Sequence, residues 1–293
     1  MKKRRGQGKR GIKIIATIFS LMVICLAVFS TVKIIAKHNQ TLTINEYVVR
    51  SERLPSAFDG YKIAQISDLH NAEFGENNEN LLSALSTARA DVIVITGDLV
   101  DSRKTDLDVA LRFVEKAVEI APIYYVTGNH EASISAYVDL KKGLISCGVT
   151  VLENQAVTVE KDGASIRFMG LQDPLFRKDL QTEETYVKAQ LSTFAWGAEY
   201  TVLLSHRPEF FDVYAEYGAD LVFCGHTHGG QFRIPTIGGV FVPNQGFFPK
   251  YDAGKFEKGQ TTMFINRGLG NSRFPFRINN PPEIILTTLK RKQ

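Results

Sequence analysis

Residues 220–231 read DLVFCGHTHGGQ, a short apolar run followed by two histidines that glycines bracket. Alternate residues of an extended segment point to opposite sides, so His226 and His228 can reach one target only if the backbone bends. Glycine accepts positive φ angles at little cost, and the flanking glycines permit such a bend. Taken alone, the segment is weak evidence for a metal site, because it also fits a polar turn after a buried strand.

The positions of the other histidines point to a shared site. The chain has six histidines; five of them follow a β-like run, and four of these five neighbour Asn or Gly. Only His38 lies outside a motif. Histidines placed at random would not follow strands in this way.

A strand-helix rhythm begins at Tyr61. Strands are predicted at residues 61–67, 91–96 and 122–127, with helices at 80–89 and 107–120 between them. Residues 91–96 form a continuous apolar run, as expected for a strand whose two faces are buried. Asp68 and Asp98 are 30 residues apart and Asp98 and Asn129 are 31 apart, which is the length of a strand-helix-strand unit.

Further elements follow to the end of the chain. Helices are predicted at 135–146, at 183–193 and from Pro208, and strands at 41–49, 155–160, 164–169, 200–205, 261–265 and 283–289. Asp162-Gly163 is a hairpin turn signal between two of these strands. Residues 234–258 show neither the helical nor the strand periodicity of apolar residues, so they are predicted to form a long surface loop. Loops of this kind are often functional.

The N-terminus predicts a membrane anchor. Residues 1–13 hold seven cations and no acid, and residues 14–32 carry no charge. A transmembrane helix needs roughly 20 apolar residues, whereas the apolar part of a signal peptide has about 7–15. The length therefore favours an uncleaved signal-anchor, although cleavage after Ala27 or Ser30 stays open. Basic flanks remain in the cytoplasm, so the rest of the chain is expected outside it.

Charge and cysteine usage restrict the possible partners. The net charge is +4, but without residues 1–13 the chain has 28 basic and 31 acidic residues, a net charge of −3. A duplex-binding protein needs a basic footprint on its folded domain, so no nucleic-acid partner is expected. Three cysteines show no disulfide framework, and a Cys147–Cys224 pair stays open.

Metal-binding groups follow five of the predicted strands. In open α/β sheets, sites form outside the carboxyl ends of the strands, so these groups are expected to converge. Imidazole suits zinc and iron, whereas carboxylate and carbonyl oxygens suit manganese. One ion needs three or four groups, and the presence of eight suggests two ions about 3.5–4 Å apart, as in phosphatases and nucleases. The eight are Asp68, His70, Asp98, Asn129, His130, His206, His226 and His228.

Each residue alone also has an ordinary structural explanation. Asp68 could cap a helix, Asp98 could belong to a turn, and His206 could be a hydrogen-bonded core histidine. Because such explanations must all hold at five strand ends at once, a shared metal site is favoured.

Together the motifs resemble the signature of the calcineurin-like metallophosphoesterase family. They are Asp68-x-His70, Gly97-Asp98, Gly128-Asn129-His130-Glu131, His206 and Gly225-His226-x-His228, and they occur in order within residues 61–231. The later segments Arg267-Gly268-Leu269-Gly270, Pro275-Phe276-Arg277 and Pro281-Pro282-Glu283-Ile284 resemble the bacterial membrane-anchored branch. The resemblance implies an α/β fold of four layers, a sandwich of two mixed β-sheets flanked by helices.

The resemblance also implies roles for these residues. One divalent ion would be held by Asp68, His70, Asp98 and His228. The other would be held by Asp98, Asn129, His206 and His226, so that Asp98 bridges the two. The ions would be Mn, Zn or Fe, and a hydroxide between them would attack phosphorus, since metal coordination lowers the pKa of bound water toward about 7. His130 would stay off the metals and protonate the leaving alkoxide.

Several neighbouring residues have two interpretations. Glu131 either orients His130 or is a helix N-terminal acid. Arg103 and Arg207 could pair with phosphate oxygens, but a solvated surface position is the favoured interpretation for both. The aromatic residues of the 234–258 loop either meet an acyl chain or pack beneath the loop; they are Phe241, Phe247, Phe248 and Tyr251.

The expected protein has four parts: a cationic cytoplasmic tail at 1–13, a transmembrane signal-anchor at 14–32, a connector with one edge strand at 33–60, and a metallophosphoesterase domain at 61–290. We expect a single-pass protein of the cell membrane with its catalytic domain outside the cytoplasm. Its substrates would be phosphate mono- or diesters, or a lipid- or envelope-related pyrophosphate. Relatives in the anchored branch that cleave UDP-diacylglucosamine suggest an amphiphilic substrate.

Two alternatives come from other functional classes. A catalytically silent metal-binding scaffold of the same fold would have lost a ligand or His130, and none is lost. A metal-dependent nuclease conflicts with the acidic body and with the anchor. The physiological substrate, the metal identity and the oligomeric state stay open.

Overall fold

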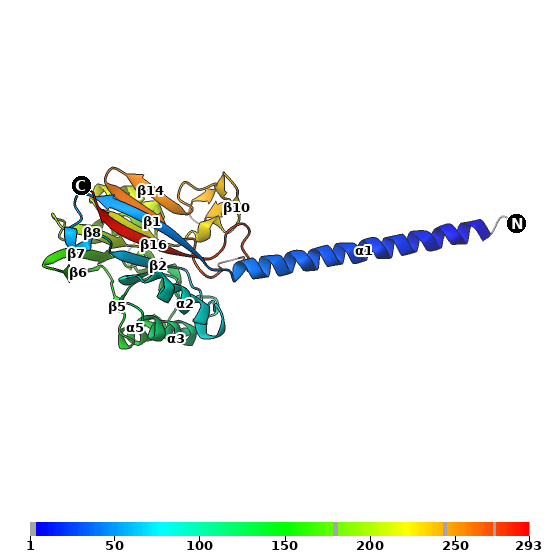
Figure 1. Ribbon diagram of the computed structural model, residues 1–293, viewed down its shortest axis with the longest axis horizontal. Helices are drawn as coiled ribbons and strands as arrows, with labels where there is room; N and C mark the ends of the chain where they lie inside the picture. Colours follow the sequence, from blue (N-terminus) through cyan, green and yellow to red (C-terminus); the bar gives the residue numbers. More distant parts are fainter. Residues whose placement is uncertain (1–3, 178–180, 243–244, 272–273, 293) are drawn as a thin grey trace.

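The computed structural model describes residues 4–177, 181–242, 245–271 and 274–292, and two six-stranded sheets form its centre (Figure 1). In the first sheet the strand order is β1-β16-β2-β3-β4-β5, and only the β16–β2 pair is antiparallel. Its strands are β1 (Thr43–Ser51), β2 (Lys62–Ile66), β3 (Val92–Thr96), β4 (Ile123–Val126), β5 (Thr150–Val151) and β16 (Glu283–Arg291).

The second sheet has the order β14-β15-β9-β8-β7-β6, with antiparallel pairs at its two edges and parallel pairs inside. Its strands are β6 (Gln155–Lys161), β7 (Ala164–Gly170), β8 (Tyr200–Leu204), β9 (Leu221–Cys224), β14 (Gly254–Lys258) and β15 (Thr261–Ile265). Both sheets are therefore mixed, as predicted.

Three apolar clusters hold four layers together. Side chains of α2 (Glu79–Ala88), α3 (Leu107–Ala117) and α5 (Tyr137–Ser146) pack on the first sheet. A second cluster, which includes Val94 and Phe223, fills the space between the sheets. Side chains of α6 (Glu183–Leu191) and α7 (Phe211–Glu216) cover the second sheet. The predicted four-layer sandwich is confirmed, and Figure 1 shows α2, α3 and α5 as a layer below the first sheet.

Local sequence signals explain the elements that lead to the site. All five residues of β3 are buried, as its continuous apolar run predicts. Helix α3 begins after Asp106, whose side chain accepts the backbone N–H groups of Asp108 and Val109 as an N-cap. The β6–β7 hairpin turns at Asp162 and Gly163, which both have positive φ angles, as a two-residue turn of this kind requires.

The prediction of an irregular loop at 234–258 is wrong in part. This region contributes the edge strand β14 and two short hairpins, β10 (Arg233–Ile234) with β11 (Gly238–Gly239) and β12 (Phe241–Val242) with β13 (Gly246–Phe247). Two-residue strands are too short to show a period of two, and β14 has Phe256 as its one large apolar residue. Long-range pairing with β15, rather than local pattern, therefore determines this edge.

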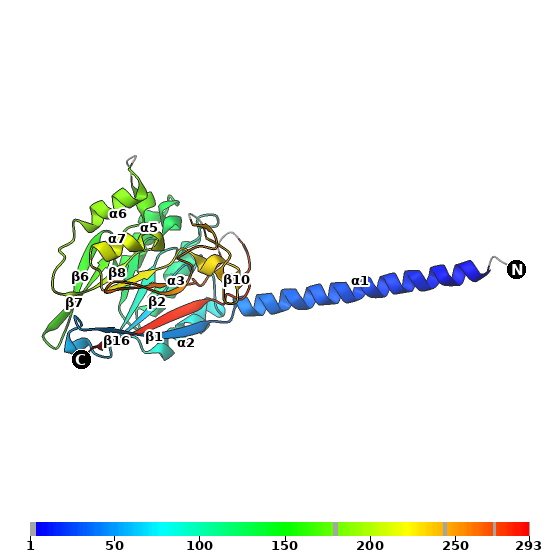
Figure 2. The same ribbon diagram turned by 90° about the horizontal axis from the view of Figure 1, so that it is seen from above.

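Helix α1 (Arg4–Asn39) projects away from the body (Figures 1 and 2). Its segment Lys13–Ser30 has a mean hydropathy of 2.3 and is not buried against the rest of the protein. In the described part of the chain, this is the helix long and apolar enough to cross a membrane. Residues 1–3 of the predicted cationic tail lie outside the described residues.

Candidate metal centre

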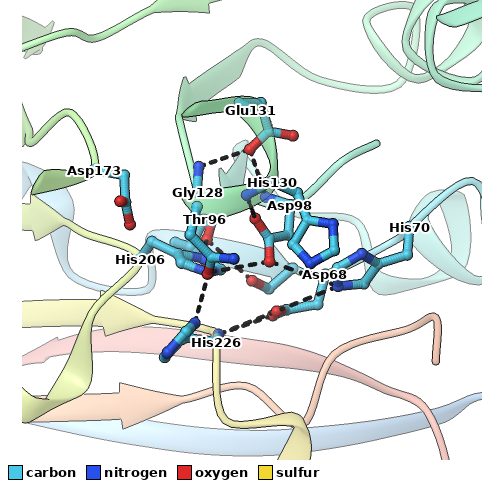
Figure 3. A network of polar contacts seen from close by, with 12 residues as sticks. Asp68, His70, Thr96, Asp98, Gly128, His130, Glu131, Asp173, His206 and His226 are labelled. Carbon is cyan, nitrogen blue, oxygen red and sulfur yellow. Dashed lines mark hydrogen bonds and ion pairs between the residues drawn. The ribbon is translucent and has the colours of Figure 1, made fainter. Parts of the chain in front are cut away.

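All seven predicted ligands follow strand ends from the two sheets and lie in one region. Figure 3 shows Asp68, His70, Asp98, His206 and His226 among them. The first sheet contributes the segments after β2, β3 and β4, and the second sheet contributes those after β8 and β9. Because the site uses both sheets, strands that are 158 residues apart in sequence bring Asp68 and His226 into hydrogen-bond contact. The predicted convergence of the strand ends is therefore observed.

Among the described residues, three groups of possible ligand atoms are formed, and two of them, called the two clusters below, consist of predicted ligands; the third joins His130 to His70 and Asp101. In the first cluster, His228 Nε2 lies 3.3 Å from Asp68 Oδ1 and 3.1 Å from His70 Nε2. In the second cluster, His206 Nε2 lies 3.3 Å from Asp98 Oδ2 and 3.2 Å from His226 Nδ1. Within each cluster the ligand atoms lie within 4.8 Å of one another.

Asn129 and Asp98 complete the arrangement. Asn129 Oδ1 lies 3.2 Å from His206 Nε2, so the amide joins the second cluster. Asp98 Oδ2, which already faces His206, also lies 3.6 Å from His70 Nε2 of the first cluster. One carboxylate oxygen thus faces both clusters, which is the position that a bridging ligand needs.

The backbone at the ligands is held in an uncommon conformation. Positive φ angles occur at His226 (72°) and His228 (48°), and also at Asp68, His70 and Asp98. Such residues cost of order 1–3 kcal/mol each and gather at functional sites. The histidines themselves, with Gly229 and Gly230 following, make the bend expected after β9. His228 belongs to the first cluster and His226 to the second, so the bend directs the two side chains to different clusters.

Two glycines are required by close approach to ligand groups. A Cβ atom on Gly225 would lie 1.9 Å from Ser67 Oγ and 2.5 Å from Asp68 Oδ2. A Cβ atom on Gly128 would lie 2.3 Å from Asp98 Oδ1. Any side chain at either position would displace a candidate ligand, which explains why the motifs contain glycine there.

Burial controls the protonation of three ligand histidines. It lowers the pKa of His70 to about 3 and holds the pKa of His226 and of His228 well below the usual value. These imidazoles are therefore neutral at pH 7 and keep an unprotonated nitrogen. A neutral imidazole is the form that binds a metal ion.

The carboxylates respond to burial and to their histidine neighbours. Burial raises the pKa of Asp68 to about 6. Burial also acts to raise the pKa of Asp98, but the charge and hydrogen bond of His206 outweigh it and hold that pKa well below the usual value. Burial would lower the pKa of His206, yet Asp98 raises it to about 10. The pair therefore behaves as a buried ion pair when no cation is bound.

The donor set fits two divalent ions. Six of the seven candidate ligands are less than one-tenth exposed, and their oxygen and nitrogen atoms face one another. The Nε2 atoms of His70 and His228 lie 3.1 Å apart beside the buried carboxylate of Asp68, an arrangement that apolar core packing does not require. Mixed imidazole, carboxylate and amide donors suit manganese, iron or zinc.

His130 lies beside the clusters and belongs to neither. Its ring packs edge-on against His70 with centroids 4.4 Å apart. The backbone N–H of Ser102 donates to His130 Nδ1 at 2.9 Å, so the neutral ring carries its proton on Nε2. Asp101 Oδ1 lies 3.8 Å from the same Nδ1. Neither Ser102 nor Asp101 was predicted as a site residue from the sequence. The signal that could have identified Asp101 is that it is another carboxylate, three residues after Asp98.

Glu131 organises the backbone of the site. Its carboxylate accepts N–H groups from Gly128 at 2.7 Å, Asp98 at 2.8 Å, Leu99 at 2.8 Å and Val100 at 3.2 Å. Burial raises the pKa of Glu131 to about 7. The backbone N–H donors act in the opposite direction, because they favour the charged carboxylate. The interpretation as a helix N-terminal acid is therefore correct, because Glu131 is the third residue of α4 (Asn129–Ala132) and its carboxylate accepts the backbone N–H of the N-cap residue Gly128.

We expect Glu131→Ala to lower the free energy of unfolding of the metal-free protein by at least about 3 kcal/mol, because buried donors left unpaired cost about 1–3 kcal/mol each. Urea unfolding in the presence of a chelator measures this without a contribution from bound metal. Glu115→Ala, at an exposed position on α3, is the matched control, with a loss of less than about 0.5 kcal/mol. Equal losses would mean that the four contacts do not hold the loop.

The expectation that Arg207 lies on the surface is wrong. Its side chain is 2% exposed, and its guanidinium donates from Nε to Asp173 Oδ2 at 2.6 Å and from Nη2 to Asp173 Oδ1 at 3.2 Å. Nη1 of Arg207 lies 3.4 Å from His226 Nε2, so Arg207 contacts the ring nitrogen of His226 that is not part of the second cluster. Arg103 is half exposed and pairs with Asp101, which agrees with its expected surface position.

Arg277 is a second buried arginine behind a ligand. Its Nη2 lies 3.2 Å from His228 Nδ1, on the side of the ring opposite the cluster, and Nη1 donates to Arg267 O at 2.6 Å. Groups that contact the outer nitrogen of a metal-binding imidazole fix its orientation. Arg277 is 49 residues from His228, so no local pattern could have assigned this contact.

Comparison with known proteins matches more than half of the chain to one family. The family described as calcineurin-like phosphoesterase matches residues 61–230. The chain is 30% identical over 250 residues to the uncharacterized metallophosphoesterase YkuE of Bacillus subtilis (strain 168), covering 84% of each chain. It is 29% identical over 244 residues to the phosphodiesterase YaeI of Escherichia coli (strain K12), covering 78% of this chain and 82% of that protein. The solved structure of TT1561 of Thermus thermophilus shares the fold, with a TM-score of 0.50 and 14% identity over 72% of this chain and 90% of that one.

Proposed function

The chain belongs to the calcineurin-like phosphoesterase family and is a metal-dependent phosphoric ester hydrolase, and we propose that it works as a membrane-anchored enzyme with a dinuclear centre. Its proposed substrates are phosphate mono- or diesters, or a lipid- or envelope-related pyrophosphate. The proposed ligands are Asp68, His70, Asp98 and His228 for one ion and Asp98, Asn129, His206 and His226 for the other.

The observation that carries this proposal is the position of Asp98. A single oxygen, Oδ2, lies 3.6 Å from His70 Nε2 and 3.3 Å from His206 Nε2, which belong to different clusters. Asp98 Oδ1 accepts the backbone N–H of His130 at 2.8 Å, so the carboxylate cannot turn away freely. Two clusters that share a fixed carboxylate support two ions better than one.

Each part of the chain has a defined task in the proposed mechanism. Two bound divalent ions supply Lewis acidity toward phosphoryl oxygens and lower the pKa of a bound water toward about 7. Glu131 and the glycines at 128 and 225 hold the ligand loops at the required separation. His130 donates the proton on Nε2 to the leaving oxygen, while the Ser102 N–H keeps Nδ1 unprotonated and fixes the ring.

The complete ligand set and the retained His130 disfavour the silent scaffold. A nuclease stays disfavoured by the net charge of −3 outside residues 1–13. The test is a screen of the full-length protein with Mn²⁺ against phosphomonoesters, phosphodiesters and nucleotide pyrophosphates. Turnover of at least one class that a chelator abolishes is expected. No turnover of any class would favour the scaffold.

The proposed orientation can be measured separately. The seven cations of residues 1–13 are expected to hold the N-terminus in the cytoplasm. A tag fused after Gln293 should then be cut by protease added outside intact cells, or inside the outer membrane where one exists. A tag that stays protected until the cell membrane is lysed would reverse the orientation and place catalysis in the cytoplasm.

A further inference from the structure

Exposed apolar side chains concentrate on one part of the body. Outside α1, thirteen large apolar side chains are exposed in the described part of the chain, and eight of them fall within residues 234–242, 245–248 and 274–278. We call the six most exposed of these the apolar rim: Ile234, Ile237, Phe247, Phe248, Phe274 and Ile278. Phe247 is 73% exposed and Ile237 is 64% exposed. A grouping of this kind marks an interaction surface.

The segments of the apolar rim are joined to one another. The backbone N–H of Phe248 donates to Val240 O at 2.9 Å, and that of Val240 donates to Phe232 O at 2.8 Å. The ring of Phe232 lies 5.2 Å from that of Phe274, and its backbone forms a β-bridge with Ile278. The rim is therefore one surface built from two parts of the sequence.

Helix α1 meets the body at this surface. Asn39, its last residue, accepts the backbone N–H of Arg277 through Oδ1 at 3.0 Å. Arg277 directly precedes Ile278 of the apolar rim. Thr43 donates its N–H to Pro282 O at 2.9 Å, which fixes the next residues of the chain to the same segment. Both views show β10 beside the point where α1 leaves the body (Figures 1 and 2).

The length of α1 brings the apolar rim close to the membrane surface. The apolar stretch Lys13–Ser30 ends nine residues before Asn39. Nine helical residues span about 14 Å at about 1.5 Å each, and the polar layer of a bilayer is roughly 5–8 Å thick on each side. A helix perpendicular to the membrane places Asn39 within about two helical turns of the membrane surface. The usual tilt of about 20° reduces this distance.

The apolar rim is also connected to the metal centre. The backbone N–H of Phe232 donates to Gly230 O at 2.6 Å, and Gly230 lies two residues after His228. Arg277 contacts His228 Nδ1 at 3.2 Å. A molecule held at the rim therefore lies beside the segments that position one candidate ligand.

We propose that the apolar rim is a membrane-contacting surface, which seats the body on the bilayer crossed by α1 and presents the metal centre to phosphate esters whose apolar part stays in that bilayer. This inference rests on the proposed function, because it requires α1 to be a membrane anchor. Apolar and aromatic side chains on a rigid surface bind the boundary between headgroups and acyl chains in proportion to the area that they bury. The occupant is the bilayer to which the chain is already attached.

A single tryptophan makes the contact measurable in the full-length protein. Trp196 is the one tryptophan of the chain, so Phe247→Trp in a Trp196→Phe background gives one fluorophore on the apolar rim. The vesicles contain equimolar phosphatidylcholine and phosphatidylglycerol, with the phosphatidylcholine brominated near the glycerol end of its acyl chains. Val138→Trp in the same background is the matched control, because Val138 is 60% exposed on α5, in the helical layer over the first sheet.

Brominated vesicles should reduce the emission of the tryptophan at 247 by half or more and leave that at 138 unchanged. No quenching at 247, in protein that floats with the vesicles on a density gradient, overturns the proposal. A blue-shifted but unquenched tryptophan at 247 overturns it as well, because a second copy or another protein would then cover the apolar rim. Protein that does not float shows that the anchor in the proposed function is wrong, and the inference fails with it.

A kinetic comparison tests the consequence for substrates. Two nitrophenyl phosphate diesters are offered in these vesicles, one with a long alkyl chain and one with a methyl group. The wild type should favour the long-chain ester, and Phe247→Glu with Phe248→Glu should reduce that preference by about tenfold without changing turnover of the methyl ester, since charges weaken interfacial binding. Val138→Glu with Ile145→Glu is the control. An unchanged preference in the rim variant contradicts the proposal. Hydrolysis of neither ester by the wild type would count against diesters as the proposed substrates, and the quenching result would then decide the rim.

Discussion

Asp98→Ala should abolish turnover and lower the bound metal below two ions per chain, while the fold is retained. Asp98 Oδ2 faces both clusters, so its loss removes the charge that separates two cations. A metal ion contributes several kcal/mol to the stabilisation of the transition state, and about 1.4 kcal/mol corresponds to a factor of ten in rate. Turnover is therefore expected to fall by about a thousandfold or more, measured together with metal content by elemental analysis.

Two further variants separate the loss of charge from structural damage. Asp98→Asn keeps the volume and an oxygen that can accept the His130 N–H, yet it should lose metal and turnover as Asp98→Ala does. Asp139→Ala changes an exposed aspartate on α5 and should behave as the wild type. Two ions and normal turnover in Asp98→Ala would show that the dinuclear assignment is wrong.

His130→Ala should slow alkyl phosphate esters far more than nitrophenyl esters. A general acid contributes about 10²–10⁴-fold when the leaving oxygen needs a proton, and a nitrophenolate needs little help. His130 lies outside both clusters, and its proton sits on Nε2 because Ser102 N–H donates to Nδ1. Metal content should stay near two ions per chain.

His226→Ala provides the contrast, because its Nδ1 belongs to the second cluster at 3.2 Å from His206 Nε2. This variant should lose metal and slow both esters alike. If His130→Ala also slows both esters equally and lacks an ion, His130 is a ligand and another group donates the proton.

The strand ends of this site could be predicted from local sequence because each carries its own signal. A buried apolar run such as 92–96 predicts a strand, and a polar group directly after it predicts a position at the carboxyl edge. The order of the longer helices and strands and the β6–β7 hairpin turn followed from the same patterns, whereas the two short hairpins and β14 did not. Long helices and continuously apolar strands depend mainly on nearby residues, so one sequence contains enough information to predict them.

The features that were missed depend on residues far apart in the sequence. The assignment of His226 and His228 to different ions was implied by the family resemblance, but the positive φ angles of both residues were not predicted. The partners of Arg207 and Arg277 lie 34 and 49 residues away, so their burial was invisible in local charge patterns. The helix N-terminal position of Glu131 was among the predicted interpretations, but its contacts with the N–H groups of Asp98, Leu99 and Val100 form only in the folded loops.

The central claim is that two metal ions share Asp98 in this protein. Its most direct test is a titration of the metal-free, full-length chain with Mn²⁺, in which bound metal per chain and turnover of a nitrophenyl phosphate ester are followed together. We expect binding to saturate at two ions per chain and full turnover to require the second ion. Saturation at one ion with full turnover, or turnover that persists in the metal-free protein, would contradict the account.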